Sequence, residues 1–267
     1  MGSMTDGIKR WLRWEEDEVP AGPVPRLLRR YLLWNNDWYG SHAIRYLPIA
    51  RLVRRTPRAG DVRLLEVGSA DRGIGPFIKE RVVAVDLAFH RDNLRRAGGW
   101  PIPVRGKIES LPFRDGSFEV AVAVDLFEHL PRAVREPAVK EMARVARDRV
   151  VIAVPAGQRA REMEEQLDRF HRRRFGVSNR WLVEHRQHGL PEGSDLCDMI
   201  RKAVPSARVT LIGNAPLALW YLLEWLDIAI PRNYLRRPLT EWLVRLASRW
   251  SARKPYRLIV ILELDGR

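Results

Sequence analysis

The feature that most constrains the fold of this chain is an alternation of short apolar runs with longer helical segments. One run, FEVAVAV at 118–124, is apolar at nearly every position, which is typical of a strand buried on both faces of a sheet. Strands that alternate with helices predict βαβ units and a parallel sheet. The predicted strands are 63–67, 81–85, 118–124 and 149–154, and the predicted helices between them are 90–97 and 131–146.

We expect an α/β core with helical additions. Residues 59–213 would form this core, which includes a polar insertion rich in Arg and His at 156–195. Residues 1–58 would form a helical N-terminal layer, and residues 256–267 would supply the final strand. The Trp-rich segment 214–255 is long for a connection between neighbouring strands, so we expect it to form a helical lid over the site.

The composition excludes several classes of protein. Of the 267 residues, 46% are hydrophobic and 30% are charged, which argues against a disordered chain. The single cysteine, Cys197, excludes an internal disulfide and a cysteine-rich zinc site. The sequence has no signal-peptide pattern and no apolar run long enough to span a bilayer, so we expect a cytoplasmic protein. The Trp and Arg residues of 214–255 leave a peripheral contact with a membrane open.

The net charge of +14 suggests an anionic partner. A nucleic acid, a membrane surface and a phosphorylated substrate would each fit this charge. The sequence has no RRM, KH or double-stranded-RNA-binding signature, so charge alone supports a nucleic acid. The oligomeric state is not predictable from these features.

A glycine-containing turn follows the first strand, and an acidic residue ends the second. The turn begins at Glu66 and contains Gly68, and Asp86 follows Glu66 by 20 residues. Glycine allows the chain to turn tightly and a ligand to approach the backbone. An acid at the end of the second strand can accept hydrogen bonds from ribose hydroxyl groups. Together these features indicate a nucleotide-type site.

Three motifs resemble those of a known family. The segments LLEVGS at 64–69, LPFRDGSFEV at 111–120 and DLFEHLP at 125–131 are similar, in order and spacing, to motifs of class I S-adenosylmethionine-dependent methyltransferases. The resemblance is to the small-molecule, ubiquinone-biosynthesis-like branch, methyltransferase type 11, and covers about residues 60–157. It implies a three-layer, Rossmann-like fold with a mostly parallel sheet of seven strands, the last antiparallel. It also implies S-adenosyl-L-methionine as the cofactor.

The resemblance implies a role for each matched residue. The turn at Glu66 and Gly68 would contact the methionine part of the cofactor, and Asp86 would bind the ribose. The adenine would lie beside Leu87 and accept a hydrogen bond from the backbone N–H of Ile108. The implied cofactor-binding residues are Glu66, Gly68, Ser69, Ala70, Asp86, Leu87, Ile108, Asp125 and Leu126, of which the last two would line the transferred methyl group.

The chain departs from the family pattern at three positions. Ala70 and Arg72 stand where the family often has glycine, and Lys107 stands where it often has an aspartate that accepts from the adenine amino group. An ammonium group cannot accept a hydrogen bond. These departures keep a non-catalytic, methyltransferase-like binding protein open as an alternative.

His129 is the candidate catalytic base, because the loop after the fourth strand would face the methyl group. A structural role at the start of a helix is an equally good interpretation of this residue. His171, His185 and His188 lie in the polar insertion, where the pattern favours solvated side chains over an acceptor pocket. No ligand spacing matches a zinc or non-haem iron site, so we expect no metal.

Three functions follow from these observations. The first is a methyltransferase that acts on oxygen or nitrogen of a small molecule, such as a sugar or a lipid-linked intermediate. The second is an RNA methyltransferase, although the loop at 125–128 lacks the Asn/Asp-Pro-Pro-Tyr pattern of enzymes that methylate amino groups of nucleic acids. The third is the non-catalytic binding protein.

Overall fold

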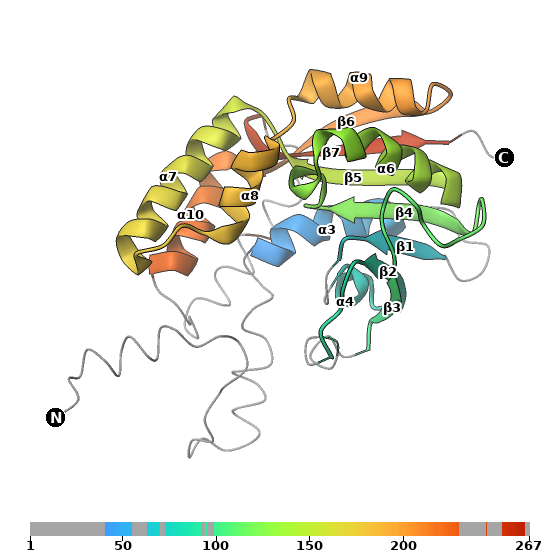
Figure 1. Ribbon diagram of the computed structural model, residues 1–267, viewed down its shortest axis with the longest axis horizontal. Coiled ribbons are helices and arrows are strands. Elements are labelled where there is room, and N and C mark those ends of the chain that lie inside the picture. Colours follow the sequence, from blue (N-terminus) through green and yellow to red (C-terminus); the bar gives the residue numbers. More distant parts are fainter. Residues whose placement is uncertain are drawn as a thin grey trace, which may run out of the picture.

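The computed structural model describes residues 41–54, 63–69, 73–91, 94, 99–229, 244 and 253–264. Its centre is a seven-stranded sheet with the strand order β3-β2-β1-β4-β5-β7-β6 (Figure 1). The strands are β1 (Leu64–Val67), β2 (Val82–Asp86), β3 (Pro101–Arg105), β4 (Phe118–Val124), β5 (Ala146–Pro155), β6 (Arg208–Pro216) and β7 (Pro255–Glu263).

The strand directions confirm the expected fold class. The first five strands pair in parallel, whereas β7 is antiparallel to both of its neighbours, β5 and β6. Residues Val120–Val124 of β4 are buried on both faces, with exposed fractions of 0–4%, as the FEVAVAV pattern predicts. The protein therefore has a Rossmann-like α/β sheet that is mostly parallel.

The strand β3 was not predicted from the sequence. Pro101 and Pro103 interrupt the apolar pattern there, and proline cannot donate to a neighbouring strand. The strand lies at the edge of the sheet, where half of the backbone groups need no partner strand. An edge position therefore explains why these prolines are compatible with a strand.

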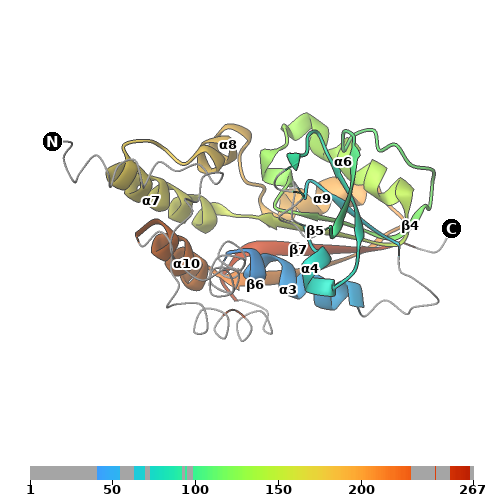
Figure 2. The same ribbon diagram turned by 90° about the horizontal axis from the view of Figure 1, so that it is seen from below.

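Helices cover both faces of the sheet (Figure 2). The helices α3 (Ser41–Arg54) and α4 (Gly75–Ile78) pack on one face, and α6 (Arg132–Val145) and α9 (Gly193–Ala203) pack on the other. Each face contributes its own group of buried apolar side chains. These two groups form the core that holds the strand ends in place.

Three helices lie together beyond the carboxyl ends of the parallel strands (Figure 1). They are α7 (Gln158–Phe175), α8 (Arg180–His188) and α10 (Leu217–Ala229). Trp220 of α10 stacks on Tyr256 of β7 with ring centroids 3.5 Å apart, and Trp225 stacks on Phe170 of α7. The first helix of the predicted lid therefore packs on the polar insertion and on the sheet.

Two predicted segments differ from the structure or lie partly outside it. The strand β6 runs to Pro216, past the predicted core boundary at 213, because Gly213, Asn214 and Pro216 pair with β7. Most of the predicted N-terminal layer, residues 1–40, lies outside the described residues, as do 230–243 and 245–252 of the predicted lid.

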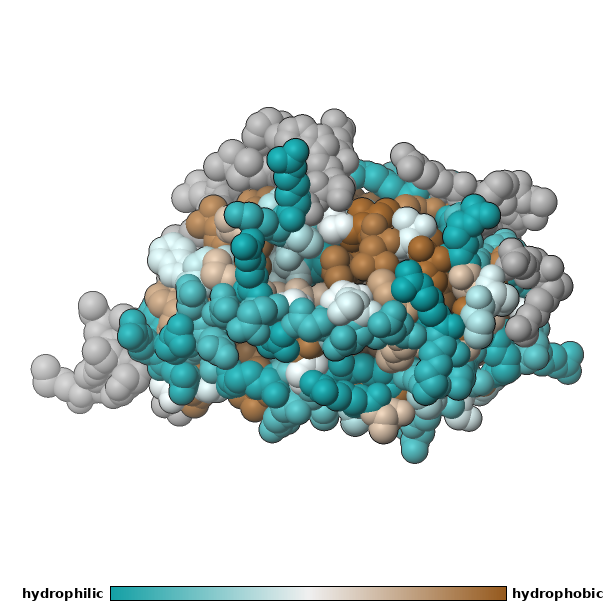
Figure 3. Space-filling model, turned by 90° about the horizontal axis from the view of Figure 1, so that it is seen from above, coloured by the Kyte–Doolittle hydropathy of each residue, from teal (hydrophilic) through white to brown (hydrophobic). Residues whose placement is uncertain are grey.

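The molecular surface is mostly hydrophilic on the face seen in Figure 3, where one apolar area lies among the polar side chains. Among the described residues, no helix combines the length and the apolar character that crossing a membrane requires.

Candidate functional site

Glu66 lies one residue before the end of the buried strand β1, and one of its oxygens has no hydrogen-bond partner among the described residues. Its side chain is 1% exposed, and its Oε2 accepts a hydrogen bond from the N–H of Ile74 over 2.7 Å. Its Oε1 has no hydrogen-bond partner among the described residues. Burial raises the pKa of Glu66 to about 7, although hydrogen bonding by the Ile74 backbone and by the Tyr46 side chain opposes this rise. Glu66 is therefore a buried carboxyl group that can still accept a hydrogen bond.

The turn after β1 depends on glycine at two positions. Gly68 has a φ of +73°, and a Cβ there would come 2.6 Å from the side chain of Leu126. Gly73 has a φ of +63°, and a Cβ there would come 2.2 Å from Oε2 of Glu66. Both glycines thus let other groups approach the backbone. Ser69 is buried in this turn, whereas Ala70 and Arg72 lie outside the described residues.

The end of β2 brings the predicted ribose and adenine residues close together. Asp86 accepts a hydrogen bond from the N–H of Leu87 through Oδ1, over 2.7 Å. The Leu87 side chain is 71% exposed, so it can cover a flat ligand. The N–H of Gly106 donates to the carbonyl of Asp86, which places the segment with the buried Ile108 beside this strand end. Lys107, next to Ile108, is exposed.

Asp125 follows β4 and is held by two arginines. Nη2 of Arg257 lies 2.6 Å from Oδ2, Nε of Arg257 also donates to the carboxylate, and Nε of Arg45 lies 3.1 Å from Oδ2. Burial disfavours the ionised form, but Arg257 and Arg45 outweigh it and lower the pKa of Asp125. Its φ of +50° is unusual for a residue other than glycine. Asp125 is therefore an ionised group that fixes this turn.

His129 lies in the short 3₁₀ helix η1 (Phe127–His129), opposite His185 of α8. The two Nε2 atoms are 3.3 Å apart. Nδ1 of His129 lies 2.9 Å from a Glu184 oxygen, and Nδ1 of His185 lies 2.9 Å from a Glu164 oxygen. Burial and the neighbouring His185 lower the pKa of His129, and Glu184 opposes this shift. The two imidazoles thus face each other, each oriented by a carboxylate.

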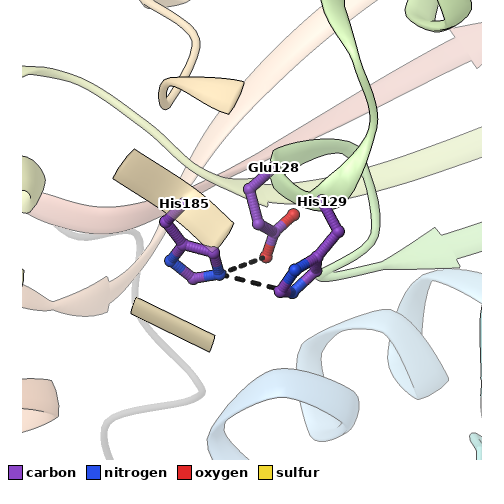
Figure 4. A group of neighbouring side chains, drawn as sticks. All are labelled: Glu128, His129 and His185. Carbon is purple, nitrogen blue, oxygen red and sulfur yellow. Dashed lines mark hydrogen bonds and ion pairs between the residues drawn. The ribbon is translucent and has the colours of Figure 1, made fainter. Parts of the chain in front are cut away.

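Glu128 completes this cluster (Figure 4). Its side chain is fully buried, and neither of its oxygens has a hydrogen-bond partner among the described residues. Burial and the charge of Asp125 raise its pKa well above the ordinary value. One ligand atom each from Glu128, His129 and His185 lie within 4.8 Å of one another, close enough for a single metal ion to bind after small movements of these side chains.

The sequence alone did not identify this cluster. His185 was expected to be solvated but is 7% exposed, because its helix packs against η1. Leu182 lies three residues earlier on the same buried face, and this spacing was the available signal. Ligand spacing along the chain could not reveal the cluster, since His129 and His185 are 56 residues apart.

Known proteins share both sequence and fold with this chain. Residues 65–154 match the model of the methyltransferase domain family, Methyltransf_11. A protein from Encephalitozoon cuniculi (strain GB-M1), named as a methyltransferase, is 39% identical over 130 residues. That alignment covers 48% of this chain, and it spans 61% of the relative's length.

Solved structures of low sequence identity share the fold. One is magnesium protoporphyrin IX methyltransferase from Synechocystis PCC 6803 with bound SAH, with a TM-score of 0.53, 10% identity and coverage of 98% of this chain and 95% of that one. Another is a protein from Pyrococcus horikoshii OT3, with a TM-score of 0.52, 13% identity and coverage of 90% and 97%. At such identities the likeness establishes the fold alone.

Proposed function

We propose that this chain methylates a small-molecule acceptor. Its residues 65–154 belong to the class I S-adenosylmethionine-dependent methyltransferases of the type 11 kind. The observation that carries the proposal is the meeting of three features at one edge of the sheet. They are the carboxyl of Glu66, the strand-end Asp86 and the His129 cluster after β4. In parallel α/β sheets, ligands bind at this edge.

The residues at the ends of β1 and β2 fit S-adenosyl-L-methionine. Glu66 offers an oxygen without a partner among the described residues, and Gly68 allows close approach of a ligand to the backbone. Asp86 would accept from the ribose, and Leu87 and Ile108 would border the adenine. Bound there, the cofactor would supply a methyl group on a positively charged sulfur. The task of the protein would then be to align the acceptor and exclude water.

His129 is the residue that we propose to receive the acceptor proton. It lies at the end of the short helix η1 that follows β4, and Glu184 orients its ring through Nδ1. Asp125 is a poor candidate for this role, because two arginines hold its carboxylate. It would instead fix the turn that carries Leu126 and His129.

The acceptor that we propose is bulky and partly apolar, such as a lipid-linked intermediate or a sugar derivative. The helix α10 supports this proposal, since Arg45 contacts both Asp125 and Glu224 of α10, with the latter at 4.0 Å. Leu222 and Trp225 of α10 are 47% and 36% exposed. The start of the predicted lid thus lies beside the carboxyl edge with apolar side chains available.

A non-catalytic binding protein is the second candidate. The side chain of Leu126 lies against Gly68, within the turn that would hold the cofactor. Leu126 would have to move aside, or the turn would have to bind a smaller ligand. The RNA methyltransferase has the charge of +14 as its support.

An acceptor screen tests the proposal. The protein would be incubated with S-adenosylmethionine labelled in the methyl group and with separate pools of sugar nucleotides, lipid-linked precursors, aromatic small molecules and structured RNA. We expect label transfer to a small-molecule or lipid-linked pool. Transfer to RNA alone would contradict the proposed acceptor class, and binding of the cofactor without transfer to any pool would favour the non-catalytic candidate.

A further inference from the structure

We propose that Glu128, His129 and His185 bind one divalent transition-metal ion at the carboxyl end of β4 (Figure 4). The three residues come from two parts of the chain, η1 and α8, that pack against each other. Arg135 holds these parts together, because its guanidinium donates to the carbonyls of Leu130, His188 and Gly189.

The hydrogen bonds of the two imidazoles leave a lone pair on each Nε2. An ionised carboxylate can only accept, so the Nδ1 of each ring that bonds to Glu184 or Glu164 carries the proton. Tyr256 also donates to Glu164, over 2.7 Å, and fixes that carboxylate. With Nδ1 of each ring donating to its carboxylate, Nε2 is the remaining ring nitrogen that can bind a cation, and the two Nε2 atoms point toward each other.

Among the described residues, no positively charged side chain is in hydrogen-bond contact with Glu128 or lies between the two imidazoles. Two nitrogen lone pairs 3.3 Å apart repel each other unless a cation or a shared proton lies at that place. Beside them, at 4.0 Å from Nε2 of His185, is an oxygen of the fully buried Glu128, which has no hydrogen-bond partner among the described residues. A buried carboxyl group without a paired charge is either protonated, as the raised pKa of Glu128 indicates, or coordinates a metal. One cation would satisfy all three groups.

The nearby arginines do not supply that cation. Arg257 and Arg45 both contact Asp125, which precedes Glu128 by three residues. Both arginines attract the charge of Glu128 from a distance, but among the described residues neither forms a hydrogen bond or ion pair with Glu128 or with the imidazoles, and Arg135 donates to backbone carbonyls. Asp125 in turn is occupied by its arginines, so the ligand set is one carboxylate and two imidazoles.

The donor set indicates the class of metal. Two imidazole nitrogens and one carboxylate oxygen suit zinc and other first-row transition metals, whereas magnesium prefers oxygen ligands. Sites with three protein ligands keep open positions for water or substrate. The His129 side chain is 20% exposed, so the open side of the site lies toward solvent. Glu164 and Glu184 match the outer carboxylates that orient metal-binding histidines.

The role of the metal rests on the proposed function. A metal after β4 would lie where the acceptor is expected, and it would bind an oxygen or nitrogen of the acceptor and lower the pKa of that group. With the metal bound, His129 would act as a ligand, and the lowered pKa of the acceptor group would replace the base that we propose for the metal-free protein. The acceptor would accordingly carry a hydroxyl or amine able to ligate a metal.

Metal titration of the full chain tests the site itself. The protein would be stripped with a chelator and titrated with Zn²⁺ by calorimetry and with Co²⁺ by visible absorption, without cofactor or acceptor. We expect one ion per chain. His185→Ala and Glu128→Gln should each weaken binding by more than about 100-fold, since even loss of an outer-shell partner costs 10–100-fold. His171→Ala and His188→Ala are matched controls that should bind as the unchanged protein does.

A milder variant guards against loss of folding. Glu184→Gln keeps all three ligands and should weaken Zn²⁺ binding by about 10–100-fold, with an unchanged melting temperature before metal addition. Equal Zn²⁺ affinity in the unchanged protein, Glu128→Gln and His185→Ala would overturn the proposal, as would the absence of a Co²⁺ absorption band. Failure of methyl transfer would leave this result unaffected, because metal binding is measured alone.

Discussion

The guanidinium of Arg257 donates two hydrogen bonds to the carboxylate of Asp125, with Nη2 2.6 Å from Oδ2, although the residues are 132 positions apart. Arg257 is fully buried and lies on the antiparallel strand β7, while Asp125 directly follows the central strand β4. The pair therefore locks the turn after β4, which carries Leu126, Glu128 and His129, to the other half of the sheet.

Breaking this pair should strongly destabilise the protein. Asp125→Ala leaves the buried charge of Arg257 without its main partner, and we expect a loss of about 3–5 kcal/mol in the free energy of unfolding. Urea denaturation followed by circular dichroism measures this loss. The control is Asp198→Ala, whose pair with Arg201 is exposed and should contribute within about 1 kcal/mol. Similar midpoints for the two variants would contradict the structural role of Asp125.

Glu66 should make the stability of the protein depend on pH. Its pKa rises from 4.5 to about 7 on folding, so between these values the folded state holds a proton that the unfolded state has lost. Stability should therefore decrease as the pH rises from 5 to 8, with a contribution from Glu66 of about 2 kcal/mol. Urea denaturation at pH 5 and pH 8 should show a smaller decrease in the free energy of unfolding for Glu66→Gln than for the unchanged protein. An equal decrease in the two proteins would disprove the raised pKa of Glu66.

The turn after β1 should not tolerate a side chain at Gly73. In Gly73→Ala the new Cβ would collide with Oε2 of Glu66 in addition to the strain of a positive φ. Gly99→Ala is the matched control, because Gly99 has a φ of +77° and no atom of the described residues lies within 4 Å of the added Cβ. We expect Gly99→Ala to destabilise the protein by about 1–2 kcal/mol and Gly73→Ala to destabilise it more. Thermal unfolding of the two variants measures both losses. Equal losses of stability in the two variants would mean that the Glu66 side chain moves away from the added Cβ without an energetic penalty.

His129→Ala should lower turnover by about 10²–10⁴-fold once an acceptor is known. Cofactor affinity should stay nearly constant, since the cofactor would contact β1 and β2. His171→Ala, in the exposed part of α7, should retain full activity. Unchanged turnover in His129→Ala would mean that His129 is not the base and that the protein acts by positioning the acceptor and the cofactor alone.

The sequence predicted the parts of the fold that follow from local patterns. The buried strand β4 is apolar at nearly every position, and such a run has few alternatives. The alternation of strands and helices likewise places Glu66 and Asp86 at the ends of β1 and β2. The edge strand β3 escaped prediction because Pro101 and Pro103 are unfavourable in most strands.

The contacts around the candidate site depend on long-range packing. The register between β5 and β7 brings Arg257 to Asp125, and no spacing in the sequence records that register. The position of α8 brings His185 to His129, and Arg135 fixes that position through backbone carbonyls. A polar, Arg-rich segment gives no sign that one of its histidines is buried. The sequence therefore predicted the candidate residues at the ends of the strands, but not the contacts of Asp125 with Arg257 or of His129 with His185.

We propose that the carboxyl edge of this sheet binds S-adenosylmethionine. Calorimetric titration of the cofactor into the unchanged protein, Asp86→Ala and the surface control Asp198→Ala tests it most directly. We predict one site per chain, a loss of about 1.5–3 kcal/mol in binding free energy for Asp86→Ala, and no loss for the control. Absence of binding to the unchanged protein, or equal affinity of the unchanged protein and Asp86→Ala, would contradict the account.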